Sequence, residues 1–210
     1  RRRHTRYISV TGVQTCALPI SATCCVGSRP VSPASRAPEN HGSRLTPLPL
    51  SNYYLSPGGF TVTTAVIVDA IRTPLGKRNG KLKDWHPVDL ASEVLRALVD
   101  RTGIDPAIVE DVVMGCVMQV GEQGVNIARN AVLAAGWPES VPGTTVDRQC
   151  GSSQQAAHFA AQAVLSGAHD VIVAAGVEVM TRVPMGSSMA DGKFGFPFRS
   201  EEHTSELQSH

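Results

Sequence analysis

Short apolar runs alternate with amphipathic segments through the middle of this chain, and that alternation constrains the fold more than any other feature. The runs at 63–69 and 170–175 are continuous and apolar, which predicts buried strands. Two further apolar stretches, 109–120 and 141–146, lie between them. Three segments have helical character and each is followed by glycine, which predicts helices: 87–100, 126–135 and 151–166. This order predicts a layered α/β domain whose strands are at least partly parallel.

Charge divides the chain into a body and two flanks. Residues 62–198 hold 11 Lys and Arg against 14 Asp and Glu, whereas the flanks hold the other 8 Arg and only 4 acids. Regions with such different charge composition rarely belong to one folded unit. We therefore predict that the folded body is 62–198.

The outermost flanks resemble translated oligonucleotide. One DNA string, read in opposite orientations, can encode both Val10–Ile20 and Arg199–Ser209, and that string resembles a sequencing-library adapter. We predict that 1–21 and 199–210 are adapter-derived and exclude them from the expected fold. A mitochondrial presequence is the alternative for the first segment, because that segment is rich in Arg and free of acids. The presequence leaves the C-terminal match unexplained.

Residues 22–61 differ again, because they are dense in proline and have little periodicity. Such composition favours extended, unpacked chain. We predict a disordered extension or an untranslated leader, with a native start at Val62 from a GTG codon. N-terminal mass spectrometry that found earlier residues in the native protein would exclude that start.

Bulk properties narrow the partners and the compartment. Of five cysteines, only Cys116 and Cys150 lie in the body, without the spacing of a disulfide framework, which favours a reduced, cytoplasmic compartment. No apolar run reaches the roughly 20 residues that a membrane-spanning helix needs. The net charge of +1 favours no polyanionic partner. We expect no membrane, no nucleic acid and no metal.

The segment VDRQCGSSQQA at 146–156 places Cys150 where an extended stretch becomes an alanine-rich helix. A cysteine at a helix N-terminus faces the positive end of the helix dipole and free N–H groups, which stabilise thiolate over thiol. Gly151 leaves room for a substrate carbonyl beside the sulfur. A thiolate suits acyl transfer between thioesters. On position alone, a small buried structural cysteine is an equal alternative.

Four segments of the body resemble the thiolase family in order and spacing. VDRQCGSSQQA resembles the nucleophile signature, and Val68–Lys77 resembles the opening strand with its Arg-Thr-Pro turn. Met114–Arg129 resembles the second strand with the Asn-x-Ala-Arg helix, and Ala174–Pro184 resembles the Gly-x-Glu-x-Met turn. The family usually has Cys-x-Ser-Gly where this chain has Cys-Gly-Ser-Ser. The pattern is similar to the degradative, β-oxidation branch more than to the biosynthetic one.

The resemblance implies a thiolase-like layered fold, with a mixed sheet and helices on both faces, and an acyl-CoA C-acyltransferase. Cys150 is then the nucleophile that carries the acyl group as a thioester, and its backbone N–H is an oxyanion donor. The implied substrates are acyl-CoA and CoA, with no further cofactor. The implied assembly of the full-length protein is a homodimer or a homotetramer.

The family's other catalytic groups come from motifs that this sequence lacks: Asn-Glu-Ala-Phe, Gly-His-Pro and Cys-x-Gly-x-Gly. We therefore expect this chain to be inactive alone. The alternatives are a ketosynthase of the same superfamily and a non-catalytic thiolase-like domain. The native sequence past Phe198 would decide among them.

Other residues of the body also have expected roles or positions. Three are expected to shape the pocket wall or a dimer interface, or else to cap the second helix and form a structural ion pair: Gln123, Asn126 and Arg129. Glu178 and Met180 are predicted to pack after a strand near the site. His158, two helical turns past Cys150, is predicted to be a bystander. His86 is predicted to begin the first helix.

Overall fold

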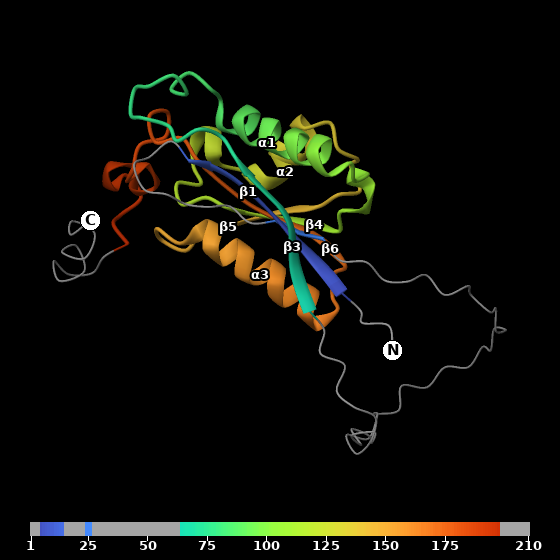
Figure 1. The fold of residues 1–210 in the computed structure, drawn as a ribbon. Coiled ribbons are helices and arrows are strands. Elements are labelled where there is room, and N and C mark those ends of the chain that lie inside the picture. The colour runs from blue at the N-terminus through green and yellow to red at the C-terminus, as the bar shows by residue number, and fades with distance from the viewer. Residues whose placement is uncertain (1–4, 15–23, 27–63, 198–210) are drawn as a thin grey trace, which may run out of the picture.

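The computed structural model describes residues 5–14, 24–26 and 64–197, the last range with side chains. These residues form one six-stranded sheet with helices on both faces (Figure 1). The strands are β1 (Thr5–Gln14), β2 (Cys24–Val26), β3 (Thr64–Arg72), β4 (Asp111–Gly115), β5 (Gly143–Val146) and β6 (Val171–Glu178). The helices are α1 (Pro87–Thr102), α2 (Ile127–Ala134) and α3 (Ser152–Ser166), with short 3-10 turns η2 (Pro106–Ile108), η3 (Gly121–Gln123) and η4 (Ser187–Gly192).

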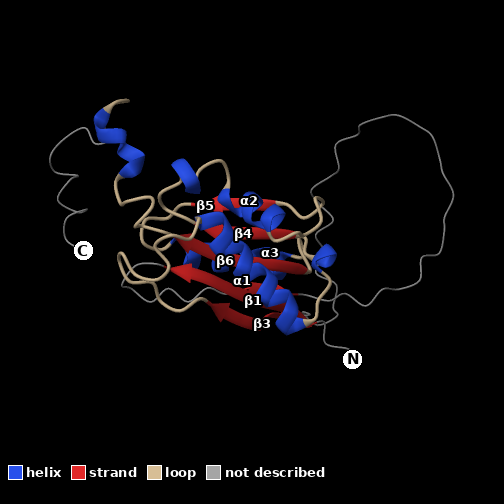
Figure 2. Cartoon of the chain, turned by 90° about the horizontal axis from the view of Figure 1, so that it is seen from above, coloured by secondary structure: helices blue, strands red, loops and turns tan. Residues whose placement is uncertain are grey.

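The strands lie in the order β3-β1-β2-β6-β4-β5, and β1 also pairs with β6. Figure 2 shows β3, β1, β6, β4 and β5 following one another across the sheet. Strand β4 is parallel to both β5 and β6, and β1 is parallel to both β3 and β6. Among the described strands, only β2 runs antiparallel to its neighbours. Parallel neighbours need long crossover connections, which α2 and α3 provide on either side of β5. The predicted α/β class with parallel strands is confirmed.

Every strand and helix predicted for the body forms, with bounds shifted by a few residues. The side chain of His86 caps α1, because its Nδ1 accepts a hydrogen bond from the Val88 N–H at 3.3 Å. This confirms its predicted place at the start of the helix. Gly103 and Gly167 end α1 and α3 with φ of 66° and 82°, a left-handed conformation that glycine adopts without steric cost.

The N-terminal part of the chain is where the structure departs from expectation. Residues 5–14, which we excluded from the fold, form β1 between β3 and β6, and residues 24–26 form β2. The β1 run contains Thr, Tyr, Ile and Val, which favour strands, and the backbone groups of β3 and β6 need partners there. The adapter origin of 1–21 stays a prediction. The rest of the 22–61 leader and the segment 199–210 lie outside the described residues.

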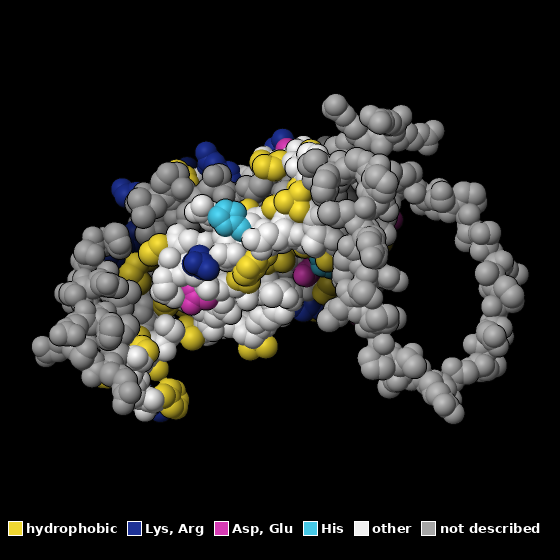
Figure 3. Space-filling view, turned by 90° about the horizontal axis from the view of Figure 1, so that it is seen from below, with side chains coloured by type: hydrophobic (Ala, Val, Ile, Leu, Met, Phe, Trp, Pro, Cys, Tyr) yellow, Lys and Arg dark blue, Asp and Glu magenta, His cyan; other side chains and the backbone are white. Residues whose placement is uncertain are grey.

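The core lies on both faces of the sheet. In Figure 1, α1 and α2 cover one face and α3 covers the other. The largest fully buried side chains include Leu95, Leu98, Met114, Ile127, Ile172 and Val164. The α3 face, seen from below in Figure 3, also presents apolar side chains to solvent. Phe159 and Leu165 of α3 are 44% and 48% exposed.

Candidate active site

Cys150 lies in the turn between β5 and α3, and its side chain is exposed. β5 ends at Val146, and Gly151 is the N-cap of α3. The first N–H groups of a helix have no partner within the helix and favour an anion, and Cys150 directly precedes the N-cap of the helix that offers them. The predicted position of Cys150 at a helix start is confirmed, whereas its catalytic role stays a prediction.

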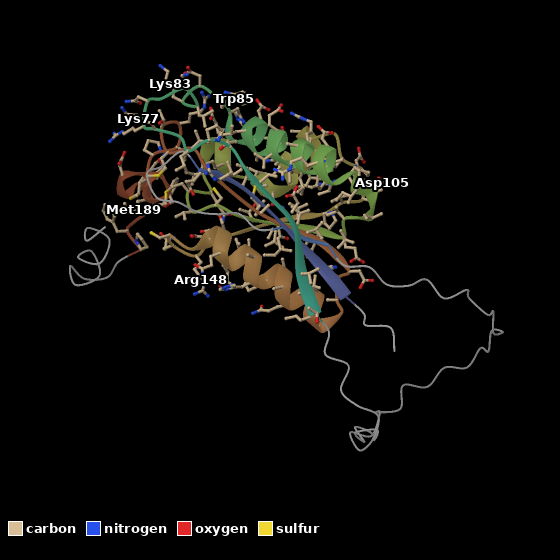
Figure 4. The ribbon with its side chains drawn as sticks, viewed as in Figure 1. Lys77, Lys83, Trp85, Asp105, Arg148 and Met189 are labelled. Atoms are coloured by element: carbon tan, nitrogen blue, oxygen red, sulfur yellow. The ribbon has the colours of Figure 1, made fainter. Side chains whose placement is uncertain are left out.

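The backbone of Cys150 is strained. Its φ is 58°, in the left-handed region that residues with a Cβ avoid. The Gly151 N–H donates to the Arg148 carbonyl at 2.6 Å and tightens the turn. Arg148 extends from this turn at the beginning of α3 (Figure 4). Such conformations persist where the surroundings hold them, and they cluster at functional sites.

Two glycines set the distance between α3 and the sheet. A Cβ on Gly115, the last residue of β4, would lie 2.2 Å from the Ser153 nitrogen. A Cβ on Gly176 in β6 would lie 1.8 Å from the Ser153 Oγ. Because only glycine leaves this space, the first turn of α3 lies directly against β4 and β6. The sequence reasoning missed this role, although glycine inside a strand pattern often marks a close backbone approach.

Cys116 lies at the same edge of the sheet as Cys150 but in a different environment. It follows β4 and is 1% exposed. Its Sγ accepts a hydrogen bond from Gln123 Nε2 at 3.4 Å. Burial, followed by the negative charge of Glu178, raises the pKa of the Cys116 thiol far above its usual range. Cys116 therefore remains a neutral, inert thiol.

Gln123 and Glu178 form a buried network beside Cys116. Gln123 is fully buried, and its Nε2 donates to Glu178 Oε1 at 2.8 Å and to the Met118 carbonyl at 2.9 Å. Its Oε1 accepts from the Val179 N–H at 2.7 Å. The Glu178 carboxylate also accepts from the N–H groups of Val117 and Met118. Gln123 therefore joins the segment after β4 to the end of β6, and Glu178 does more than the packing that the sequence predicted.

Asn126 and Arg129 fasten α2 to the segment that leads into β5. Asn126, the N-cap of α2, accepts from the Arg129 N–H and donates from Nδ2 to the Gly143 carbonyl at 2.7 Å. The Arg129 guanidinium donates to two backbone carbonyls, those of Val141 and Glu139. The helix-cap alternative is confirmed. The ion pair of Arg129 in that alternative does not form with any carboxylate in 64–197, where its guanidinium donates to these carbonyls.

Side chains close to Cys150 in sequence form hydrogen bonds with one another and none with the Cys150 thiol. Gln149 Nε2 donates to both Asp147 carboxylate oxygens, at 2.9 and 2.8 Å. Burial raises the pKa of Asp147, and the Gln149 bond opposes that rise. Exposed His158 lies on the body of α3, away from its first turn. Within 64–197, no side chain forms a hydrogen bond with the Cys150 thiol.

The described ranges contain neither a metal-binding cluster nor a membrane-spanning helix. No cluster of three or more His, Cys, Asp and Glu residues there could hold a metal ion. No helix there has the length and apolar character needed to cross a membrane.

This chain is a member of the thiolase N-terminal domain family. The family model described as thiolase, N-terminal domain, matches residues 65–205. The match begins after β1 and β2 and overlaps the first part of 199–210, whose adapter origin stays a prediction. It assigns the chain to the thiolases, as the four motifs indicated, and not to the ketosynthases.

Similar proteins carry related names. A steroid 3-ketoacyl-CoA thiolase FadA6 from Mycobacterium tuberculosis is 56% identical over 145 residues, which cover 69% of this chain and 36% of that protein. A 3-ketoacyl-CoA thiolase from Pseudoalteromonas translucida is 51% identical over 122 residues, covering 57% and 31%. The crystal structure of a Bacillus anthracis acetyl-CoA acetyltransferase is 44% identical over the matched region, with a TM-score of 0.47. The match covers 49% of this chain and 26% of that chain. The chain spans about a third of the length of these curated relatives.

Proposed function

We propose that the protein represented by this chain is an acyl-CoA C-acyltransferase whose acyl group is carried on Cys150. The observation that carries the proposal is an exposed cysteine in strained backbone at the first turn of α3. The names of the similar proteins, which are 3-ketoacyl-CoA thiolases, support this class of reaction. The non-catalytic alternative offers no reason for an exposed thiol at this position.

In the first step, the Cys150 thiolate attacks the thioester carbonyl of an acyl-CoA. A bond forms between the Cys150 sulfur and the carbonyl carbon, and the electron pair of the C=O bond moves to oxygen. When the carbonyl re-forms, the bond to the CoA sulfur breaks, and CoA leaves and takes a proton. The N–H groups at the start of α3, that of Cys150 included, stabilise the negative oxygen.

In the second step, the acyl group leaves Cys150. CoA thiolate accepts it to form a new thioester, or the α-carbon of a second acyl-CoA, after giving up a proton to a base, attacks it and forms a carbon–carbon bond. On either path the bond between the Cys150 sulfur and the acyl carbon breaks, and its electron pair returns to Cys150 as thiolate. Run in reverse, the carbon–carbon path is thiolysis of a 3-ketoacyl-CoA. We propose no cofactor beyond the CoA thioesters, a cytoplasmic location, and a full-length homodimer or homotetramer.

Acylation of the 210-residue chain tests this proposal. After incubation with acetyl-CoA, mass spectrometry should find one acetyl group, and peptide mapping should place it on Cys150. The Cys150→Ser variant should gain none under the same conditions, and Cys116→Ser should gain as much as the parent chain. Catalytic turnover is not expected, because no base lies beside the thiol in 64–197. An adduct on Cys116, or equal labelling of both variants, would refute the proposal.

A further inference from the structure

The side chain of Ser152 closes the turn that carries Cys150. Ser152 is the first residue of α3 and is 5% exposed. Its Oγ accepts a hydrogen bond from the Arg148 N–H at 3.0 Å and donates one to the Arg148 carbonyl at 3.2 Å. One hydroxyl thus bridges both backbone groups of a residue four positions earlier, and Cys150 lies inside the loop so formed.

The helix end of this bridge is held in place by packing against the sheet. The backbone of Ser152 and Ser153 lies against Gly115, where a Cβ would come within 2.3 Å of the Ser152 carbonyl carbon. The helix start therefore cannot shift toward the sheet. With that end fixed, the two bonds to Arg148 leave the residues between them little freedom.

The strain at Cys150 explains why such a bridge matters. A left-handed backbone is unfavourable for a residue with a Cβ, because the Cβ crowds the following carbonyl oxygen. A strained conformation persists only when its surroundings determine it. Without the bridge, the turn can relax to an ordinary conformation, and the thiol then moves away from the N–H groups at the start of α3.

We propose that Ser152 is a positioning residue: its hydroxyl holds the Cys150 thiol at the helix start by bridging the Arg148 N–H and carbonyl. The catalytic meaning of this bridge rests on the proposed role of Cys150 as acyl acceptor. The effect of the bridge on the reactivity of the thiol can be measured separately, whatever reaction Cys150 takes part in.

Ser153 provides the matched control. It is the next residue of α3, is 9% exposed and carries the same hydroxyl. Its Oγ packs against Gly176, and within 64–197 it takes part in no hydrogen bond. A change that follows only from burying a serine should therefore appear equally at both positions.

The test compares Ser152→Ala with Ser153→Ala in the 210-residue chain. Loss of hydrogen bonds worth about 1 kcal/mol changes an equilibrium about fivefold. We therefore expect Ser152→Ala to slow iodoacetamide labelling of Cys150 about fivefold and to speed amide exchange across 147–151, because the thiolate loses its helix-start donors. Ser153→Ala should leave both rates within about twofold of the parent chain. Parental labelling in Ser152→Ala would overturn the proposal.

Two further measurements keep the test decisive. Ser152→Thr retains the hydroxyl and should restore the labelling rate, so a folded Ser152→Thr chain as slow as Ser152→Ala would overturn the proposal. If Ser152→Ala does not fold, amide exchange of the parent chain decides: the Arg148 N–H should exchange more slowly than that of Gln149, and equal rates would refute the bridge.

The same chains separate this inference from the proposed function. If acetyl-CoA leaves no adduct on Cys150 while Ser152→Ala still slows iodoacetamide labelling, the acyltransferase proposal fails and the bridge stands. If parent and Ser152→Ala accept the acetyl group and iodoacetamide equally fast, the bridge fails and the acyltransferase proposal stands.

Discussion

The two cysteines of the folded body follow neighbouring parallel strands at one edge of the sheet, yet their surroundings are opposite. The N–H of Cys116 donates to the carbonyl of Val146, the last residue of the strand that leads to Cys150, at 3.0 Å. Cys116 is buried beside the Glu178 carboxylate, whereas Cys150 is exposed at the start of α3. Two cysteines that follow neighbouring strands thus differ in solvent access, in nearby charge and in backbone conformation.

The comparison also concerns stability. Around Cys116, the polar groups of Gln123 are satisfied by hydrogen bonds, and Cys116 itself is not among the residues with a left-handed φ. Around Cys150, the backbone is strained, and within 64–197 the thiol has no hydrogen-bond partner. We interpret the first region as built for stability and the second as built for access. Each prediction below changes one side of this contrast.

The largest expected effect is on thiol reactivity. At pH 7.5, iodoacetamide should label Cys150 at least about 100-fold faster than Cys116, because only an accessible thiolate reacts. Peptide mass spectrometry separates the two sites. In urea, where both environments are lost, the two rates should converge. Similar labelling rates for Cys150 and Cys116 in the folded chain would show that their environments do not differ in the way described.

The second prediction removes the buried amide. Gln123→Leu keeps the volume but leaves the Val179 N–H and the Glu178 carboxylate short of a partner, so it should lower the free energy of unfolding by about 3 kcal/mol. Urea titration followed by circular dichroism measures the change. Exposed Gln154 is the control, and Gln154→Leu should cost less than about 0.5 kcal/mol. Equal costs would show that the network contributes nothing specific.

The third prediction uses the raised pKa of Cys116. Above about pH 8.5 the unfolded chain releases the Cys116 proton while the folded chain keeps it, so the free energy of unfolding falls as pH rises. The contribution of Cys116 approaches a loss of about 1.4 kcal/mol in the free energy of unfolding per pH unit. Urea titrations at pH 8, 9 and 10 should show it.

Two variants test whether Cys116 causes this dependence of the free energy of unfolding on pH. Cys116→Ala should remove its contribution, and Cys150→Ala should leave it unchanged. Comparing slopes with pH, and not absolute stabilities, cancels the cavity that Cys116→Ala creates in the core. If the two variants lose the same slope, Cys116 does not titrate differently from an exposed thiol.

The smallest expected effect concerns the strain at Cys150. Cys150→Gly should be more stable than Cys150→Ala by about 0.5 kcal/mol, because relief of left-handed strain outweighs the added freedom of unfolded glycine. The same pair of substitutions at Gln154, within α3, should show the opposite sign, with alanine favoured by about 1 kcal/mol. Alanine favoured at both positions would argue against strain at the turn.

The sequence alone determined the elements of the body and the place of Cys150. Apolar periodicity and terminal glycines are local signals, and they located the helices because helix formation depends on neighbours three and four residues apart. The same local logic placed Cys150 at a helix start. His86 was predicted to begin the first helix, and a helix cap was one of the two alternatives for Asn126; both residues cap their helices.

Only the tertiary structure decided what those elements meet. Gln123 meets Glu178 across 55 residues of chain, and Ser153 meets Gly176 across a helix-to-sheet contact. Arg129 finds carbonyls where an ion pair was expected, and β1 enters the sheet from a segment excluded from the fold. Such partners are distant in sequence and are chosen by packing and by the need to satisfy buried polar groups. The local pattern placed Cys116 inside an apolar stretch and Cys150 at the start of a helix, and only the packing made one inert and left the other open to solvent.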